Sequence, residues 1–178
     1  MSFHLVEQAP ARLNRSELAV PGSQPQMFEK AAQSDVDVIF LDLEDAVAPD
    51  EKAQARKNII KALNEIDWGT KTMSIRINGL DTHYMYRDVV DVVEQAGERL
   101  DLIMVPKVEG PWDIHYMDQL LALLEAKHGL KKPILLHAIL ETAEGVNNVE
   151  AIATASPRMQ GISLGPADLS ASRRMKTT

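Results

Sequence analysis

The sequence contains no cysteine among its 178 residues. Disulfide bonds, thiolate metal sites and thiol nucleophiles are therefore excluded. A bound metal ion would have to be held by oxygen atoms or by histidine, and oxygen ligands favour Mg2+, Mn2+ or Ca2+. The lack of cysteine thus narrows both the nucleophiles and the metal ions that the chain can use.

Long apolar runs are also missing. No stretch approaches the ~20 apolar residues of a membrane span, and the first residues lack the apolar run of a secretory signal. We therefore expect a cytoplasmic protein with no membrane contact. The formal net charge of -7 argues against a general basic surface, so no nucleic-acid partner is expected. An anionic ligand would need local positive groups.

Short apolar runs recur about 30 residues apart, which is the length of one strand–helix unit. No linker or low-complexity tract divides the chain, so residues 1–178 are interpreted as one domain. Because β-branched and aliphatic residues dominate these runs, each is predicted to form a strand. The predicted strands are Glu17–Val20, Val38–Leu43, Thr72–Asn78, Leu102–Lys107, Ile134–Glu141 and Gly161–Leu164.

Helical periodicity fills the gaps between the predicted strands. A first helix is predicted at Gln26–Ser34, and four apolar stripes follow it. Gly97 and Gly129 are typical helix ends, and Ser156-Pro157 ends the last stripe. The stripes are formed by Ile59, Leu63 and Ile66; by Val89, Val93 and Ala96; by Met117, Leu120, Leu121 and Leu124; and by Val146, Val149 and Ile152.

Alternating strands and helices predict an α/β fold with a parallel sheet. The sheet is either open and doubly wound or closed into a barrel. No GxGxxG or GxxxxGK[ST] loop follows any predicted strand, which removes the strongest signs of a nucleotide-binding open sheet. Reactive residue types instead lie at the ends of successive strands, as at the mouth of a barrel. We therefore expect a (β/α)8 TIM barrel, of which this chain supplies about six strands.

Arg76 is the first candidate functional residue. Side chains alternate along a strand, so Ser74, Arg76 and Asn78 share the face opposite to that of Met73 and its apolar neighbours. Arg76 is then directed into the barrel, where an unpaired guanidinium is costly. It needs an anion, which is either a bound ligand or a protein carboxylate in a structural ion pair with Asp42 or Glu44.

Three carboxylates follow one another closely at Asp42, Glu44 and Asp45. They repel one another unless a cation lies near. One interpretation is an acidic cluster that precedes the next helix. Because Asp42 and Glu44 lie too far inside the predicted strand for that role, we favour an active-site role for Glu44.

Glu141 ends the fifth predicted strand, and Asp168 follows the sixth. Two carboxylates on adjacent strand ends can approach one metal ion, and Mg2+ takes one or two of them with water and substrate. Glu144 is a competing ligand, although the first turn of the next helix is the better place for it. His137 lies deeper in the strand, where a buried structural histidine is favoured over a catalytic one.

Three further features carry less information. Lys107 ends the fourth predicted strand and is either a ligand for a substrate anion or a surface lysine. Pro21-Gly22-Ser23 precedes the first helix, whose backbone N–H groups are candidates for phosphate binding. Gly165-Pro166 suggests a tight turn just before Asp168.

Five segments together resemble the citrate lyase β-subunit and HpcH/HpaI aldolase superfamily. They occur in the family's order and span nearly the whole chain. Three longer matches, PDEKAQARKNI (49–59), RINGLDT (76–82) and YRDVVD (86–91), are similar to its L-malyl-CoA/β-methylmalyl-CoA lyase branch. The five segments are LDLEDAV (41–47), SIRINGLDT (74–82), MVPKV (104–108), ILETAEGV (139–146) and ISLGPADL (162–169).

The resemblance implies a (β/α)8 barrel, Mg2+ or Mn2+, an acyl-CoA substrate and a homo-oligomer, either a trimer or a hexamer. The family's metal-binding residues match Glu141 and Asp168, and its substrate-binding arginine matches Arg76. Its CoA-contacting region matches the stretch from Ser23 through Gln24 to Lys30, and Lys30 would pair with a CoA phosphate. The substrate set that we predict is completed by Ala167, beside Asp168, and the catalytic set is Arg76 with Glu44.

The implied reaction is reversible cleavage of malyl-CoA, or β-methylmalyl-CoA, to glyoxylate and acetyl-CoA or propionyl-CoA. The metal would polarise the glyoxylate carbonyl, and Arg76 would stabilise the thioester enolate oxygen. The family's proton-transferring aspartate comes from a neighbouring subunit and matches no residue here. The alternatives are another superfamily lyase, acting on citramalyl-CoA, citryl-CoA or a 2-oxo acid, and a non-catalytic fragment.

A complete (β/α)8 barrel needs about 250 residues. We therefore expect residues 1–178 to be an incomplete barrel domain, with the remaining strands supplied elsewhere. Produced alone, the chain is expected to associate or to be poorly soluble, because an open wall exposes strand edges. It is also expected to lack lyase activity.

Overall fold

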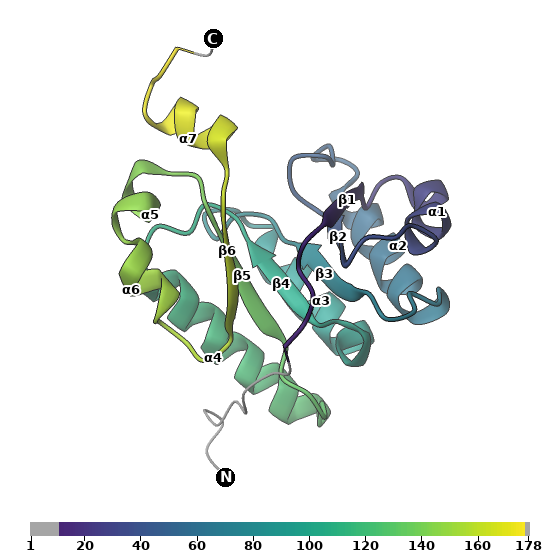
Figure 1. The fold of residues 1–178 in the computed structure, drawn as a ribbon. Coiled ribbons are helices and arrows are strands. Elements are labelled where there is room, and N and C mark those ends of the chain that lie inside the picture. Colours follow the sequence, from purple (N-terminus) through teal and green to yellow (C-terminus); the bar gives the residue numbers. More distant parts are fainter. Residues whose placement is uncertain (1–10, 177–178) are drawn as a thin grey trace.

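The computed structural model describes residues 11–176, and its sheet contains six parallel strands. Each strand pairs with the next one in the sequence, so the order across the sheet is the order along the chain. Figure 1 shows them side by side from purple to yellow. The strands are β1 (Glu17–Pro21), β2 (Val38–Asp42), β3 (Thr72–Arg76), β4 (Leu102–Val105), β5 (Leu135–Leu140) and β6 (Met159–Leu164).

This strand order confirms the α/β prediction and separates the two candidate architectures. A doubly wound sheet reverses its order at a switch point. Here the order runs from β1 to β6 without a reversal. The sheet is therefore wound in one direction, as the wall of a barrel is.

Helices connect the strands and cover one face of the sheet. The long ones pack side by side, α2 on α3 and α3 on α4, and α6 follows against α4. No helix within residues 11–176 has both the length and the apolar character needed to cross a membrane. The helices are η1 (Pro25–Met27), α1 (Phe28–Ala32), α2 (Lys52–Glu65), α3 (Met85–Ala96), η2 (Gly97–Arg99), α4 (Pro111–His128), α5 (Ala143–Asn147), α6 (Val149–Ala153) and α7 (Pro166–Ser172).

The core lies between the sheet and these helices. The first three predicted stripes face it, although Ile66 and Leu120 are only half-buried at its margin. On β3, Met73 and Ile75 belong to this core, as alternation along the strand predicts. Gly129 ends α4 in the left-handed region, at φ 65°, where glycine carries no steric penalty.

The fourth predicted stripe is only partly correct. The helix breaks at Asn148 into α5 and α6, and Val146 and Val149 are 39% and 37% exposed. The Asn148 amide donates to the carbonyl oxygen of Glu109 at 2.8 Å, so this residue is held by a neighbouring loop. Only Ile152 of the stripe is buried in the core.

Several predicted strands end too late, because side chains at their ends draw the backbone out of the sheet. Asp42 accepts hydrogen bonds from the backbone N–H groups of Glu44 at 2.9 Å and Ala46 at 3.1 Å. This turn ends β2 before Glu44. Asn78 and Lys107 likewise lie beyond β3 and β4. The first helix is also shorter than predicted, since it begins as a 3-10 turn and α1 has five residues.

Candidate active site

Arg76 ends β3 and points toward the carboxylates at the end of β2. Its Nε and Nη2 donate to the two oxygens of Asp42 at 2.7 and 2.6 Å, a two-pronged contact with a residue that is 1% exposed. Burial opposes the charge on Arg76, but its hydrogen bond and ion pair with Asp42, helped by Glu44 and Asp45, raise its pKa. Arg76 therefore stays protonated, and the ion pair considered from the sequence is formed.

Glu44 lies between two cations. Lys107 Nζ donates to its Oε1 at 2.6 Å, and Arg76 Nη1 lies 3.3 Å from its Oε2. That second contact lacks hydrogen-bond geometry, so Oε2 is buried without a hydrogen-bond partner in the part of the chain described. Burial raises the pKa of Glu44, whereas the hydrogen bond from Lys107 and the charge of Arg76 act against this rise.

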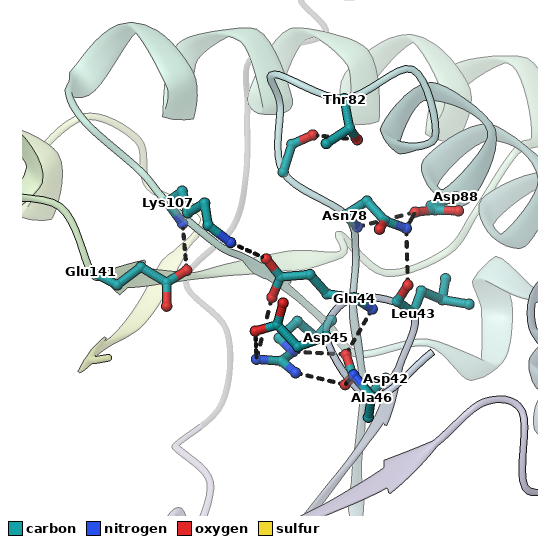
Figure 2. A network of polar contacts seen from close by, with 12 residues as sticks. Asp42, Leu43, Glu44, Asp45, Ala46, Asn78, Thr82, Asp88, Lys107 and Glu141 are labelled. Carbon is teal, nitrogen blue, oxygen red and sulfur yellow. Dashed lines mark hydrogen bonds and ion pairs between the residues drawn. The ribbon is translucent and has the colours of Figure 1, made fainter. Parts of the chain in front are cut away.

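Lys107 joins the two sides of the site. Its backbone is in the left-handed region at φ 53°, where a non-glycine residue is uncommon. In this conformation its backbone N–H donates to Glu141 Oε1 at 2.9 Å while its ammonium group reaches Glu44. Figure 2 shows Lys107 between these two carboxylates. Lys107 is thus half-buried and paired with a protein carboxylate instead of free on the surface, and its contact with a substrate anion stays a prediction.

Glu141 follows β5 directly and is 3% exposed. Gly165, in the turn after β6, lies against it: a Cβ atom placed there would be 2.5 Å from Glu141 Oε2. Asp168 follows in the first turn of α7. Burial raises the pKa of Glu141, and the negative charges of Glu44 and Asp168 add to the effect. The two carboxylates predicted to bind a metal are thus near enough to repel each other.

The donor set at this end of the sheet fits a hard divalent cation in part. Glu141 and Asp168 offer oxygen atoms only, and their mutual repulsion would be relieved by a positive charge. Within residues 11–176, no three or more histidine or acidic side chains form a complete metal site. Mg2+ does not require one, because water and substrate complete its coordination. Glu144 lies in the first turn of α5 and is exposed, as predicted.

His137 is buried in β5, as the structural interpretation predicts, at 4% exposure. Its Nε2 lies 2.5 Å from the hydroxyl of Ser163 on β6. Burial lowers its pKa to about 4, so the ring is neutral at neutral pH.

The predicted CoA-contacting residues lie after β1. The turn at Gly22 packs on β2, with its backbone N–H donating to Asp42 O at 2.8 Å. Ser23 and Gln24 are half-buried, and Lys30 is exposed on α1. Of this stretch, Gly22 beside Ser23 is the residue that contacts the strand end carrying Asp42. Ala167 is exposed beside Asp168 in α7, which extends beyond the sheet in Figure 1.

A cavity of about 320 Å3 opens beside the carboxylates. Its walls include Glu44, Lys52, Asn78, Tyr84 and Lys107. A larger hollow, of about 1050 Å3, lies at the opposite ends of the strands and includes none of the predicted site residues. Since parallel-barrel enzymes work at the carboxyl ends of their strands, the smaller cavity marks the functional side.

The model of the HpcH/HpaI aldolase/citrate lyase family matches residues 15–178. The chain belongs to this family. It is 56% identical, over all 178 residues, to the L-malyl-CoA/beta-methylmalyl-CoA lyase of Cereibacter sphaeroides, and covers 56% of that protein. The chain thus spans little more than half the length of this curated relative. The resemblance seen in the sequence is confirmed.

Solved structures of HpcH/HpaI-family relatives confirm the fold. One is the citrate lyase β subunit from M. tuberculosis, complexed with oxaloacetate and magnesium: TM-score 0.71, 28% identity, covering 90% of this chain and 62% of that one. Another is CitE from M. tuberculosis with magnesium, acetoacetate and coenzyme A: TM-score 0.68, 28% identity, covering 90% and 52%. The six strands match part of the TIM barrel of such proteins.

Sequence reasoning missed three buried or half-buried charged residues on α2 and α3 that lie next to this HpcH/HpaI-family site. Lys52 and Asp88 are buried at 7% and 0% exposure, and Arg56 lies beside them. Their signal was present in the sequence, because Lys52 and Arg56 are one helical turn apart on a helix that carries an apolar face. Nothing in the sequence indicated that they point toward strand ends.

Proposed function

We propose that the protein carrying this chain is a metal-dependent carbon–carbon lyase that reversibly cleaves malyl-CoA and β-methylmalyl-CoA. The products are glyoxylate and acetyl-CoA or propionyl-CoA. The observation that carries the proposal is the 56% identity over the whole chain to a lyase with these two substrates. The charged residues at the strand ends support it, because they suit an anionic substrate.

Glu141 and Asp168 are the proposed ligands of Mg2+ or Mn2+. A divalent ion there would supply Lewis-acid polarisation of the oxo-acid carbonyl. Lys107 fixes one oxygen of Glu141 through its backbone N–H, which leaves Oε2 directed toward the turn that precedes Asp168. The magnesium in the relative's complex with oxaloacetate supports this assignment.

Arg76 is the proposed donor to the thioester enolate oxygen. Its Nε and Nη2 are committed to Asp42, while Nη1 lies 3.3 Å from Glu44 Oε2 and 3.9 Å from Asp45 Oδ2 and donates no hydrogen bond to either. This nitrogen is therefore the one that a substrate oxygen can use. A preorganised donor aimed at developing negative charge is an effective source of catalysis. Asp42 holds the guanidinium in place, and the negative charge of Glu44 lies beside Nη1.

Coenzyme A is proposed to lie over the turn after β1, near Ser23, Gln24 and Lys30. Ala167 and Asp168 would face the oxo-acid end of the substrate. A homo-oligomer, either a trimer or a hexamer, is also proposed. A relative's complex with coenzyme A supports CoA as part of the substrate.

The test is an assay of condensation by the full-length protein, followed by separation of the CoA thioesters. Glyoxylate is offered with acetyl-CoA or propionyl-CoA, and pyruvate and oxaloacetate replace glyoxylate in parallel. We expect malyl-CoA and β-methylmalyl-CoA only with glyoxylate, and no product after chelation of the divalent metal. Product with pyruvate would instead assign a citramalyl-CoA lyase. Product with oxaloacetate would assign a citryl-CoA lyase, and no product with any pair would reject a CoA-dependent lyase.

A further inference from the structure

Two cations of α2, one turn apart, face the ends of β2 and β3. Lys52 is 7% exposed, and its ammonium group donates to two backbone carbonyls, Leu43 O at 2.8 Å and Glu44 O at 3.0 Å. Desolvation lowers its pKa, against the charges of Asp88 and other acids nearby. A buried ammonium group is costly. Here it holds the backbone of the loop that presents Glu44.

Arg56 reaches the neighbouring element. Its Nε and Nη2 both donate to Oδ1 of Asp88, at 3.0 and 2.9 Å, and the Asp88 side chain is fully buried. The second oxygen of Asp88 accepts from the backbone N–H of Asn78 at 3.1 Å and from its side-chain amide at 2.6 Å. Both carboxylate oxygens of Asp88 are thus occupied by donors from two different elements.

Asn78 closes the circuit. Its Nδ2 also donates to Leu43 O at 3.0 Å, the same carbonyl that accepts from Lys52. Figure 2 shows Asn78 between Leu43 and Asp88. Lys52 contacts Leu43, Leu43 contacts Asn78, Asn78 contacts Asp88, and Asp88 contacts Arg56. Because Lys52 and Arg56 both lie on α2, these contacts form a closed ring. We name this closed circuit the α2 ring.

The α2 ring lies directly behind the candidate site. Leu43 precedes Glu44, and Asn78 follows Arg76 after one residue. The loop backbone of both strand ends is thereby fixed to α2 and α3 instead of depending on loop conformation. The ring also gives a physical role to three segments that mark the lyase branch, since 49–59 supplies two of its residues and 76–82 and 86–91 supply one each.

We propose that Lys52, Arg56, Asn78 and Asp88 are positioning residues that hold Glu44 and Arg76 in their working geometry. The reason is mechanical. Shifts of about 1 Å at a reacting centre can lower a rate ~10²-fold, and the ring bonds to Leu43, Glu44 and Asn78 fix backbone within two residues of the site, while Arg56 holds Asp88 in place for Asn78. The catalytic part of this proposal rests on the proposed lyase function, and the geometric part does not.

The test compares two Asp→Asn variants in the full-length protein. Asp88→Asn turns one oxygen into an amide donor, which then faces either Arg56 or Asn78, both of them donors. Asp118→Asn is the matched control, because Asp118 also accepts from an arginine, Arg158, at 2.6 Å and from a second donor, the Ser156 hydroxyl, at 2.9 Å. Asp118 lies on α4 and touches no residue of the candidate site.

The first readout is kinetic, with each variant assayed well below its own unfolding midpoint. Asp88→Asn should lower kcat about 10-fold or more while KM for the acyl-CoA changes little. Asp118→Asn should leave kcat unchanged even if its unfolding midpoint falls as much as that of Asp88→Asn. If Asp88→Asn does not fold, Arg56→Lys with Arg158→Lys as control gives the same comparison. An equal effect on kcat in both members of a pair overturns the positioning role.

The second readout needs no activity. The Nε–H of Arg76, held on Asp42, gives a side-chain NMR resonance that should move or broaden in Asp88→Asn and stay in place in Asp118→Asn. An unmoved resonance in Asp88→Asn overturns the inference. If the wild-type protein cleaves no malyl-CoA, the proposed function fails alone, and the Arg76 resonance still decides whether the ring positions this side chain.

Discussion

The two sides of the barrel mouth differ in how their charges are balanced. On the β2–β4 side, Asp42 binds Arg76 through both oxygens, and Glu44 lies between Arg76 and Lys107. On the β5–β6 side, Glu141 receives one backbone N–H group and otherwise faces Gly165 and the charge of Asp168. On the first side each of these carboxylates is in contact with a cation, whereas on the second, within residues 11–176, Glu141 and Asp168 form no salt bridge and only the nearby charge of Lys107 acts on Glu141.

The two sides would therefore receive an anionic substrate in different ways. A guanidinium held by a buried carboxylate keeps its charge and its direction before the substrate arrives. Burial and nearby carboxylates disfavour the charged form of Glu141, and a divalent ion would favour it. The β2–β4 side is therefore preorganised, and we propose that the β5–β6 side is completed by a bound divalent ion. Four experiments can break or sharpen this contrast.

The largest effect is expected on the β5–β6 side. Glu141→Ala or Asp168→Ala should abolish metal-dependent turnover while the fold persists, because each removes a proposed metal ligand. Initial rates across a Mg2+ titration, together with thermal unfolding, measure this. Glu144→Ala, at an exposed acid in α5, should stay near the wild-type rate. Near-normal activity of either site variant at saturating Mg2+ would rule the assignment out.

Arg76 tests the preorganised side. Arg76→Ala should lower kcat by ~10²-fold or more, about 3 kcal/mol, which is the scale for loss of one charge-stabilising donor. Arg76→Lys should not restore the rate, since lysine cannot reproduce the planar two-pronged contact with Asp42. Steady-state kinetics at a temperature where each variant is folded gives the answer. An unchanged kcat with only a lower unfolding temperature would reduce Arg76 to a structural ion pair.

His137 should make the β5–β6 side sensitive to acid. Burial lowers its folded-state pKa to about 4, well below the ordinary value of about 6.5, so the unfolded chain binds this proton first as the pH falls. Stability from the neutral ring is complete above pH ~6.5 and falls as the pH drops toward 4, by up to about 3 kcal/mol. Urea unfolding across this range should show a shallower pH dependence in His137→Gln. An identical pH dependence in both proteins would contradict the assignment.

The smallest expected effect is at Gly165. A Cβ atom there would lie 2.5 Å from Glu141 Oε2 and 2.7 Å from its Cβ, so Gly165→Ala must shift the Glu141 side chain and the turn relative to each other. We expect the dissociation constant for Mg2+ to rise ~10-fold, the lower end of the range for groups that orient metal ligands. Isothermal titration measures it. The control is Gly161→Ala, whose added carbon would meet His137 at 3.0 Å and not Glu141. Equal Mg2+ affinity in wild type and Gly165→Ala would remove this constraint.

Much of the fold could be predicted from the sequence because its causes are local. The spacing of apolar runs predicted all six strands, and the stripes on α2, α3 and α4 predicted buried faces. Strand ends were predicted less well, because they depend on side chains such as Asp42 that bind the backbone beyond the strand. The prediction of one helix after β5 was wrong for a similar reason, since a neighbouring loop holds Asn148.

The candidate site divides in the same way. Alternation along β3 was enough to place Arg76 on the face that carries the site, and position at a strand end was enough to select Glu141. The partners of these residues were open, and both an ion pair and a ligand remained possible for Arg76. The positive φ of Lys107 could not be inferred, because lysine has no preference for that conformation and MVPKV gives no sign of it.

What the sequence alone determined, then, is which residue types stand at the ends of which strands. What only the tertiary structure decided is which of them meet, as Lys107 meets Glu44 across 63 residues and Asp88 meets Arg56 across 32. Periodicity is a property of neighbouring residues and can be read along the chain. Neutralising a buried charge requires a partner from another element, and its choice depends on how strands and helices pack.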